Sequence, residues 1–242
     1  MNSAKKGNKT RHASRTTAWF TGILLLTYFG EIGVRPLASA QESNPRLLHA
    51  RELLGKHYER SIVSESEGIR SEDVTGYIRA SVRKRLPEKY RSGARRIAST
   101  IVRESRKHGF DPLFVMAVIE NESSFKPEKL GSHGEIGLMQ ILPTTAEWYA
   151  KKAGLKFRGK KGLYDPVRNI ELGTHYLSYL RESFDAHSRL YLSAYNMGGA
   201  NVCRALAKDI WPKDYVQAVM KHYVAFYTEL TDEDGRSLAS AN

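Results

Sequence analysis

The sequence predicts an all-α, or mainly α, fold. Hydrophobic side chains recur at a spacing near 3.6 residues in segment after segment, and no stretch shows a convincing period-two alternation. No internal repeat is visible along the chain. With 242 residues, of which 41% are hydrophobic and 10% aromatic, the chain can bury the core of one or at most two globular domains. The same composition excludes wholesale disorder.

The N-terminal half is expected to hold helices at about 45–60, 71–86, 92–108 and 111–122. Pro45 opens the first of these, and Pro87 ends the second. The third has a regular apolar stripe that Gly109 terminates. Asp111 and Pro112 are an N-cap residue and an N1 proline for the fourth. Residues 61–71, rich in Ser, Glu and Gly, are expected to form a linker.

The C-terminal half begins with a turn-rich stretch at 123–142, whose glycines predict a loop or a small hairpin. Helices are expected at about 143–153, 167–184, 188–196, 199–208 and 213–230. The last of them should bury one face, which is formed by Tyr215, Val216, Val219, Tyr223 and Phe226.

The first 40 residues have the order of a secretory signal peptide. Residues 1–17 contain basic side chains and no acid, an apolar run follows at 19–29, and Ala38-Ser39-Ala40 supplies a small-residue cleavage site. We expect cleavage after Ala40 and a periplasmic or secreted protein that has no stable membrane anchor. An uncleaved anchor is the alternative. Because part of the formal charge of +12 then belongs to the signal, we expect no nucleic-acid partner.

Cysteine and histidine give no sign of a metal or another cofactor. The single cysteine, Cys203, excludes an intramolecular disulfide and a thiolate-rich metal site, and it is expected to be a small buried apolar residue. We expect no histidine to lie at a metal-ligand spacing from a second histidine or an acid. The sequence also contains no Gly-rich phosphate-binding loop of the P-loop or dinucleotide-binding kind. The histidines considered are His108, His133, His175, His187 and His222.

A candidate catalytic acid lies at the end of the helix that begins at Asp111. Phe114, Val118 and Glu122 are spaced i, i+4, i+8 and therefore share one face. A carboxyl group that ends an apolar stripe is partly buried, which raises its pKa toward the value that a general acid needs near neutral pH. Glu120 lies about 200° further round the helix and is expected in solvent. Alternatively, Glu122 only accepts hydrogen bonds from a neighbouring loop.

The motifs that follow Glu122 carry a family resemblance. In order, they are Glu122-Ser123, then Gly137-Leu138-Met139-Gln140, and then Ala194-Tyr195-Asn196-Met197-Gly198. Over roughly residues 92–230 the chain resembles the catalytic domain of the soluble lytic transglycosylases, which are goose-lysozyme-like enzymes that cleave peptidoglycan. The resemblance implies a lysozyme-like helical fold with the Gly-rich loop or small hairpin beside a cleft that holds a glycan strand.

The resemblance also implies the site. Glu122 stands at the family's catalytic glutamate, and the substrate-binding positions are Ser123, Met139, Gln140, Tyr195 and Asn196. The family usually has alanine where this chain has Glu135, whose side chain is expected to point to solvent. The implied domains are a signal peptide at 1–40, an N-terminal helical extension at 41–90, a catalytic domain at 91–230 and a flexible tail at 231–242.

A single acid suits one particular chemistry. Most glycosidases use two carboxylates, whereas the motif region supplies one well-placed acid. In peptidoglycan the acetamido group of N-acetylmuramic acid assists departure of the leaving sugar, and its C6 hydroxyl attacks C1 intramolecularly. The expected products are 1,6-anhydromuramic ends. The alternatives are hydrolysis of the goose-lysozyme type, or a non-catalytic murein-binding scaffold of a secretion or pilus machine. A secretion or conjugation machine is also a candidate partner of the enzyme.

Overall fold

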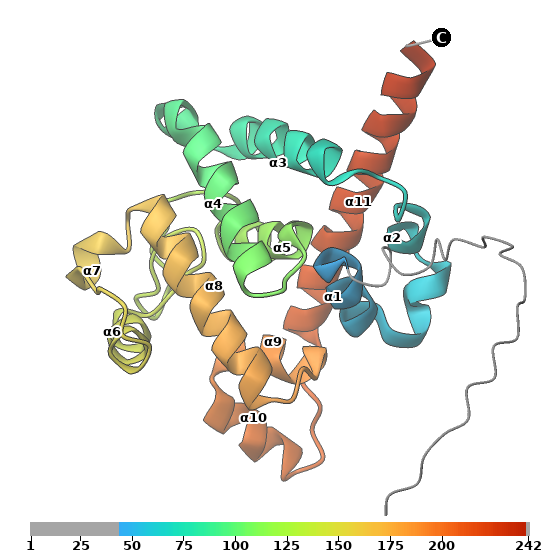
Figure 1. Cartoon of the computed structure of the whole chain (residues 1–242). Helices are drawn as coiled ribbons and strands as arrows, with labels where there is room; N and C mark the ends of the chain where they lie inside the picture. Colours follow the sequence, from blue (N-terminus) through green and yellow to red (C-terminus); the bar gives the residue numbers. More distant parts are fainter. Residues whose placement is uncertain (1–43, 241–242) are drawn as a thin grey trace, which may run out of the picture. The chain divides into compact units, whose positions relative to one another are not determined.

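The computed structural model describes residues 44–240, and the side chains of residues 44–232. Within that part every regular element is a helix, as the sequence predicted (Figure 1). Two of the elements, η1 and η2, are 3₁₀ helices. In chain order the elements are α1 (Pro45–Leu54), η1 (Gly55–Arg60), α2 (Ile62–Glu65), α3 (Ser71–Arg85), η2 (Glu88–Gly93), α4 (Ala94–Lys107), α5 (Pro112–Ser123), α6 (Pro143–Lys152), α7 (Gly159–Gly162), α8 (Pro166–Ser183), α9 (Ser188–Met197), α10 (Gly199–Leu206) and α11 (Asp214–Ser240).

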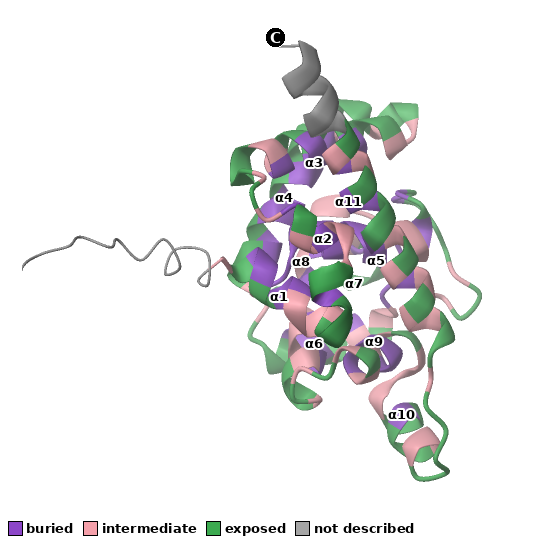
Figure 2. Cartoon of the chain, turned by 90° about the vertical axis from the view of Figure 1, so that its right-hand side faces the viewer, coloured by how far each residue is buried: buried purple, intermediate pink, exposed green. Residues whose placement is uncertain are grey.

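Helix α5 forms the centre of the packing, where it contacts α4 and α11 (Figure 1). All residues from 113 to 119 are completely buried, and Figure 2 shows buried residues concentrated on the central helices. The helix begins as predicted, because Asp111 accepts a hydrogen bond from the N–H of Leu113 at 2.9 Å. It ends where Ser124 adopts a left-handed φ of 48°. The end of α5 therefore leaves Glu122 at the edge of the core.

A buried polar network anchors α1 to α5 and α11. Asp111 Oδ2 accepts hydrogen bonds from the hydroxyls of Tyr223 and Tyr227, at 2.6 and 2.5 Å. Its backbone N–H donates to Nδ1 of His49 at 3.1 Å, and Arg46 donates to the Tyr227 hydroxyl at 3.2 Å. Because buried polar groups are costly when they lose their partners, α1 is tightly coupled to the start of α5.

The loop between α5 and α6 is held by isolated backbone bridges and one side chain. Leu130 pairs with Ile136, and Ile136 pairs with Ile141, so the expected hairpin consists of single bridges without a strand in the described residues. Asn169 on α8 donates to the Ile136 carbonyl at 2.8 Å. Gly137 has a φ of 85°, and a Cβ there would collide with the Asn169 side chain. The loop therefore packs closely against α8.

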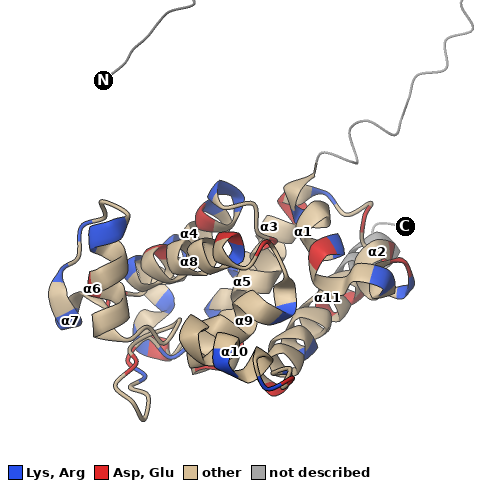
Figure 3. Cartoon of the chain, turned by 90° about the horizontal axis from the view of Figure 1, so that it is seen from below, with Lys and Arg blue, Asp and Glu red and all other residues tan. Residues whose placement is uncertain are grey.

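Two local expectations are wrong. The segment 61–71 is more than a linker, because it contains α2 and completely buries Val63 and Ser66. Cys203 is exposed rather than buried, because α10 packs through Val202 instead. The domain boundaries stay a prediction, although α11 is helical as far as Ser240, through most of the expected tail. Among the helices of residues 44–240, none combines the length and the apolar content that a membrane span requires. Seen from below, Lys and Arg are distributed over several helices (Figure 3).

Candidate active site

Glu122 opens onto a cleft of about 930 Å³. The cleft is formed by the end of α5, the loop that follows it, the first turn of α6, one residue of α8, the α9–α10 junction and the start of α11. Three of the predicted site residues, Gln140, Tyr195 and Asn196, line it together with Glu122. The remaining lining residues that matter for the chemistry are Lys129, Glu135, Tyr176 and Tyr215.

The Glu122 carboxyl group has the environment of an acid that exchanges a proton near neutral pH. Its pKa is raised from 4.5 to about 7, mainly by burial and to a smaller extent by the negative charge of Glu135. The hydrogen bond from Tyr215 and the charge of Lys129 act in the opposite direction but do not cancel the effect of burial. Lys129 also donates to the backbone carbonyl of Glu122. The carboxyl group is therefore a good proton donor and a good proton acceptor at the same pH.

Tyr215 on α11 contacts the Glu122 carboxyl group, and the sequence did not predict this contact. Its hydroxyl donates to Glu122 Oε1 at 2.5 Å. Burial and the nearby charge of Glu122 raise the pKa of Tyr215 well above its usual value, so it stays protonated and remains a donor. The apolar stripe correctly placed Tyr215 on the inward face of its helix. Nothing in that stripe distinguishes a tyrosine that packs in the core from one that reaches a carboxylate 93 positions away.

Glu135 lines the cleft, so the expectation that it points to solvent is wrong. Its Oε2 accepts a hydrogen bond from the His133 backbone N–H at 3.0 Å, and its Oε1 lies 3.3 Å from His133 Nδ1. Burial raises the pKa of Glu135, but hydrogen bonds from its own and the His133 backbone N–H groups, together with the His133 side chain, outweigh that effect and lower it. The same cleft thus contains an ionised carboxylate as well as the Glu122 carboxyl group.

Glu120 is the other acid whose expected position is wrong. Instead of lying in solvent, its carboxylate is paired with Arg85 Nε at 3.6 Å and is only 23% exposed. Glu120 does not line the cleft that Glu122 lines, as predicted, because it lies about 200° away from Glu122 around the helix. The surface it meets is covered by α3, which the periodicity of α5 alone does not reveal.

Gln140 and Tyr195 are fixed by backbone carbonyl groups. The Gln140 amide donates to the carbonyls of Lys129 and Gly137, at 3.0 and 2.9 Å, which leaves its Oε1 as the acceptor for a ligand. Gln140 itself has a φ of 44°, in the left-handed region. Tyr195 donates its hydroxyl to the Met139 carbonyl at 2.8 Å. The cleft wall is therefore rigid at both residues.

Ser123 and Met139 lie behind the cleft wall, contrary to the expectation that they touch a ligand. Ser123 is 1% exposed and donates to the carbonyls of Ile119 and Leu138. Met139 is completely buried, and its thioether packs so closely on Gly173 that a Cβ there would lie 2.5 Å from the sulfur. Both side chains support the loop that holds Gln140, rather than lining the cleft.

A row of aromatic rings leads from the cleft to the surface of α6. Tyr195 lies 5.9 Å from Tyr176, measured between ring centroids, and both line the cleft. Tyr176 stacks on Tyr179 at 6.3 Å, and Tyr179 meets Trp148 at 5.6 Å. Trp148 is 49% exposed. Lys152 lies over the Tyr179 ring, 4.1 Å from its centroid.

Comparisons with known proteins identify the domain that contains this cleft. The family model of the transglycosylase SLT domain matches residues 99–217. Membrane-bound lytic murein transglycosylase C of Photorhabdus laumondii is 34% identical over 137 residues, which cover 51% of this chain and 37% of that protein. The protein of the same name from Glaesserella parasuis is 34% identical over 125 residues, or 48% of this chain and 34% of that protein. The chain matches little more than a third of the length of these relatives.

Two solved structures resemble the fold. The lytic transglycosylase Slt of Pseudomonas aeruginosa, solved as an inactive mutant, is 31% identical with a TM-score of 0.50, over 55% of this chain and 24% of that chain. The 70 kDa soluble lytic transglycosylase of Escherichia coli is 24% identical, also with a TM-score of 0.50, over 80% of this chain and 37% of that chain. The second likeness concerns the fold alone, and both agree with the all-α architecture.

The relatives correct the expected localisation. We expected a freely periplasmic or secreted protein without a stable membrane anchor, but these relatives are named membrane-bound, which points to membrane attachment. The expected signal peptide at 1–40 lies outside the described residues.

The expected family, in contrast, is confirmed. The SLT match spans Glu122, the Gly-Leu-Met-Gln stretch and the Ala-Tyr-Asn stretch, and these are the motifs on which the resemblance depended. The same segment folds into the cleft described above. The segment 99–217 therefore belongs to the transglycosylase SLT domain family, and the comparisons support the expected resemblance of the chain to the lytic transglycosylases.

Proposed function

We propose that this chain cleaves the β-1,4 bond between N-acetylmuramic acid and N-acetylglucosamine in peptidoglycan and leaves 1,6-anhydromuramic ends, with Glu122 as the only acid and base. The observation that carries the proposal is a carboxyl group whose pKa is raised to about 7, at the wall of a cleft of about 930 Å³. A pKa near the working pH allows one group to give a proton and then take one back.

In the proposed reaction Glu122 first donates its proton to the glycosidic oxygen as the bond from C1 to that oxygen breaks. The acetamido group of the muramic acid assists the departure of the leaving sugar. The C6 hydroxyl of the same sugar then forms a bond to C1 and returns its proton to Glu122. No water is consumed, and the enzyme ends in the protonation state in which it began.

Neighbouring groups support both halves of this cycle. The Tyr215 hydroxyl donates to Glu122 Oε1 and therefore stabilises the carboxylate that exists between the two proton transfers. Gln140 offers its Oε1 to a donor on the sugar, because its amide N–H groups are already used. Asn196 adds an amide group to the same cleft.

The first test is the clearing of purified murein by Glu122→Gln. We expect this variant to lose essentially all activity while keeping the helical circular dichroism spectrum. Glu128→Gln is the matched control, because Glu128 is an exposed glutamate that pairs with Lys89 and does not line the cleft. Activity of Glu122→Gln at the wild-type level would refute the proposed role. A wild-type protein that binds murein without clearing it would favour the scaffold alternative.

One observation favours a second candidate function, which is hydrolysis of the same bond. Glu135 is ionised and lines the cleft with Glu122, so it is a candidate base for a water molecule. The two functions differ in the product, since hydrolysis leaves reducing ends. They also differ in Glu135→Gln, which should abolish hydrolysis but spare transglycosylation.

The aromatic row suggests where a long glycan strand continues. Exposed rings stack on the apolar faces of sugars, and Trp148 is half exposed at the end of a row that starts at Tyr195 in the cleft. We expect Trp148→Ala to weaken binding of long strands about tenfold while short fragments react as before. Trp211→Ala is the matched control, because Trp211 is exposed to a similar extent and contacts His187 instead of this row. Equal effects of both variants would contradict this path.

A further inference from the structure

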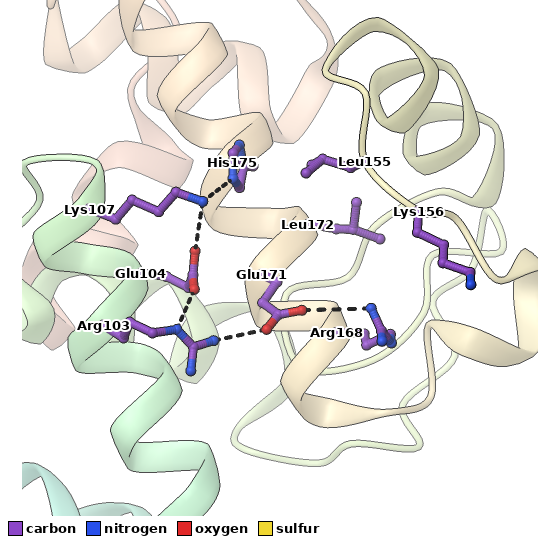
Figure 4. Close-up of a pocket in the computed structure, with 9 residues that line it drawn as sticks. All are labelled: Arg103, Glu104, Lys107, Leu155, Lys156, Arg168, Glu171, Leu172 and His175. Atoms are coloured by element: carbon purple, nitrogen blue, oxygen red, sulfur yellow. Dashed lines mark hydrogen bonds and ion pairs between the residues drawn. The ribbon is translucent and has the colours of Figure 1, made fainter.

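A cluster of metal-ligating side chains lies at the contact between α4 and α8, away from the cleft. It borders a pocket of about 220 Å³ (Figure 4). Glu104 lies in the last turn of α4, His108 is the C-cap residue directly after that helix, and His175 faces them from α8. One ligand atom from each lies within 4.8 Å of the other two. The expectation that His108 and His175 lack such neighbours is therefore wrong, because it overlooked the Glu104–His108 spacing and the packing of the two helices.

Two of the ligand atoms, from Glu104 and His108, lie close together in a largely buried setting. The Glu104 side chain is 5% exposed, and its Oε1 accepts a hydrogen bond from Arg103 Nε at 2.8 Å. Its Oε2 lies 3.9 Å from His108 Nε2. That histidine nitrogen is buried and has no hydrogen-bond partner among the described residues. A buried polar nitrogen without a partner is costly in a folded protein, and coordination of a metal ion would satisfy it.

A cationic group already lies among these ligands. The Lys107 ammonium is 2.9 Å from His175 Nε2 and 4.0 Å from Glu104 Oε2, and Figure 4 shows it directed at both. The ammonium group therefore lies between two of the candidate ligands, where an ion would have to displace it. The Lys107 side chain is 53% exposed, so it can turn into solvent and leave its place to an ion.

We propose that Glu104 Oε2, His108 Nε2 and His175 Nε2 bind a divalent transition-metal ion such as Zn²⁺, with water from the adjoining pocket as the fourth ligand. Two imidazoles and one carboxylate are a donor set that suits zinc. Bonds of about 2.0–2.2 Å require the three side chains to move closer together, by changes of rotamer and not of the backbone.

The ion would connect α4 to α8 and would stabilise the fold without taking part in the chemistry of the cleft. Because it binds the folded chain, its presence raises the free energy of unfolding by an amount that grows with the ratio of its concentration to its dissociation constant. The Lys107 ammonium and a metal ion compete for the same position. Replacing Lys107 by an uncharged residue is therefore the most direct test of metal binding.

The test is titration of the metal-free full chain with Zn²⁺ by calorimetry, together with melting curves and the absorption spectrum of the Co²⁺ form. We expect one saturable site, a higher melting temperature and the spectrum of four-coordinate Co²⁺. Lys107→Met should bind Zn²⁺ at least about tenfold more tightly, and His175→Ala should bind it at least about tenfold more weakly. His187→Ala, outside the cluster, should bind like the wild type.

Three results would overturn the proposal. The first is a failure of both the wild type and Lys107→Met to bind Zn²⁺ below millimolar concentration. The second is unchanged affinity in His175→Ala, a partly exposed residue whose replacement should leave the fold intact. The third is loss of binding in His133→Ala, because that variant would place the ion beside Glu135 in the cleft instead.

Discussion

Replacing Glu122 by glutamine should make the protein more stable at alkaline pH while it abolishes activity. In the folded chain, burial raises the pKa of Glu122 from 4.5 to about 7. The folded state therefore holds this proton more tightly than the unfolded state does, and ionisation costs stability as the pH rises from 4.5 to 7. Each tenfold change in proton affinity corresponds to about 1.4 kcal/mol, so the full cost well above pH 7 is at most about 3.5 kcal/mol. Glutamine never ionises and escapes this cost.

The assay is denaturant unfolding of the wild type and Glu122→Gln at pH 5 and pH 8.5. The difference in the free energy of unfolding should move in favour of the variant by about 2.5 kcal/mol between the two pH values, because part of the cost is already present at pH 5. Glu128→Gln should show no such change over this range, because the pKa of Glu128 is lowered by its hydrogen bond from Lys89. A difference that does not depend on pH would mean that Glu122 titrates like an ordinary glutamate and is not suited to act as a general acid near neutral pH.

Further variants test the surroundings of Glu122 and the fold that supports it. Tyr215→Phe removes a donor to the carboxylate, so the pH above which activity declines should rise by about one unit while kcat falls; an unchanged pH profile would contradict this role. Glu135→Gln removes a like charge, and the same limit should fall by less than about one unit, with anhydro ends still formed. Gly173→Ala overpacks the buried thioether beneath the loop and should cost about 1–3 kcal/mol in thermal unfolding. Deleting residues 44–60 removes His49, which accepts from the Asp111 N–H, and Arg46, which donates to the Tyr227 hydroxyl, so melting should occur well below the wild-type temperature; an unchanged transition would show that this segment is a detachable extension.

Local signals in the sequence sufficed to predict most of the helices. The Asp111 cap and the proline after it located the start of α5, and apolar spacing located its buried face. The segment 61–71 was missed because its burial depends on α11, with which α2 packs, and not on its own composition. Short helices with few apolar residues have little periodicity to detect.

The candidate site could be predicted only in part, because some of its contacts depend on local sequence and others depend on how distant segments pack. The spacing on α5 identified Glu122, because its burial follows from the helix on which it lies. The position of Tyr215 against it, and of Glu135 in the same cleft, depends on how distant segments pack. The resemblance assigned Met139 to the cleft, but a motif fixes a position along the chain and not the direction of a side chain, and here Met139 packs inward on Gly173.

The reaction product tests the central proposal most directly. Murein digested in water enriched in ¹⁸O, followed by mass spectrometry of the fragments, separates intramolecular attack from attack by water. If Glu122 acts alone, the wild type should produce 1,6-anhydromuramic ends that contain no ¹⁸O, and Glu122→Gln should produce none of them. Reducing ends labelled with ¹⁸O would contradict the proposal and would identify water, with Glu135 as its candidate base, as the nucleophile.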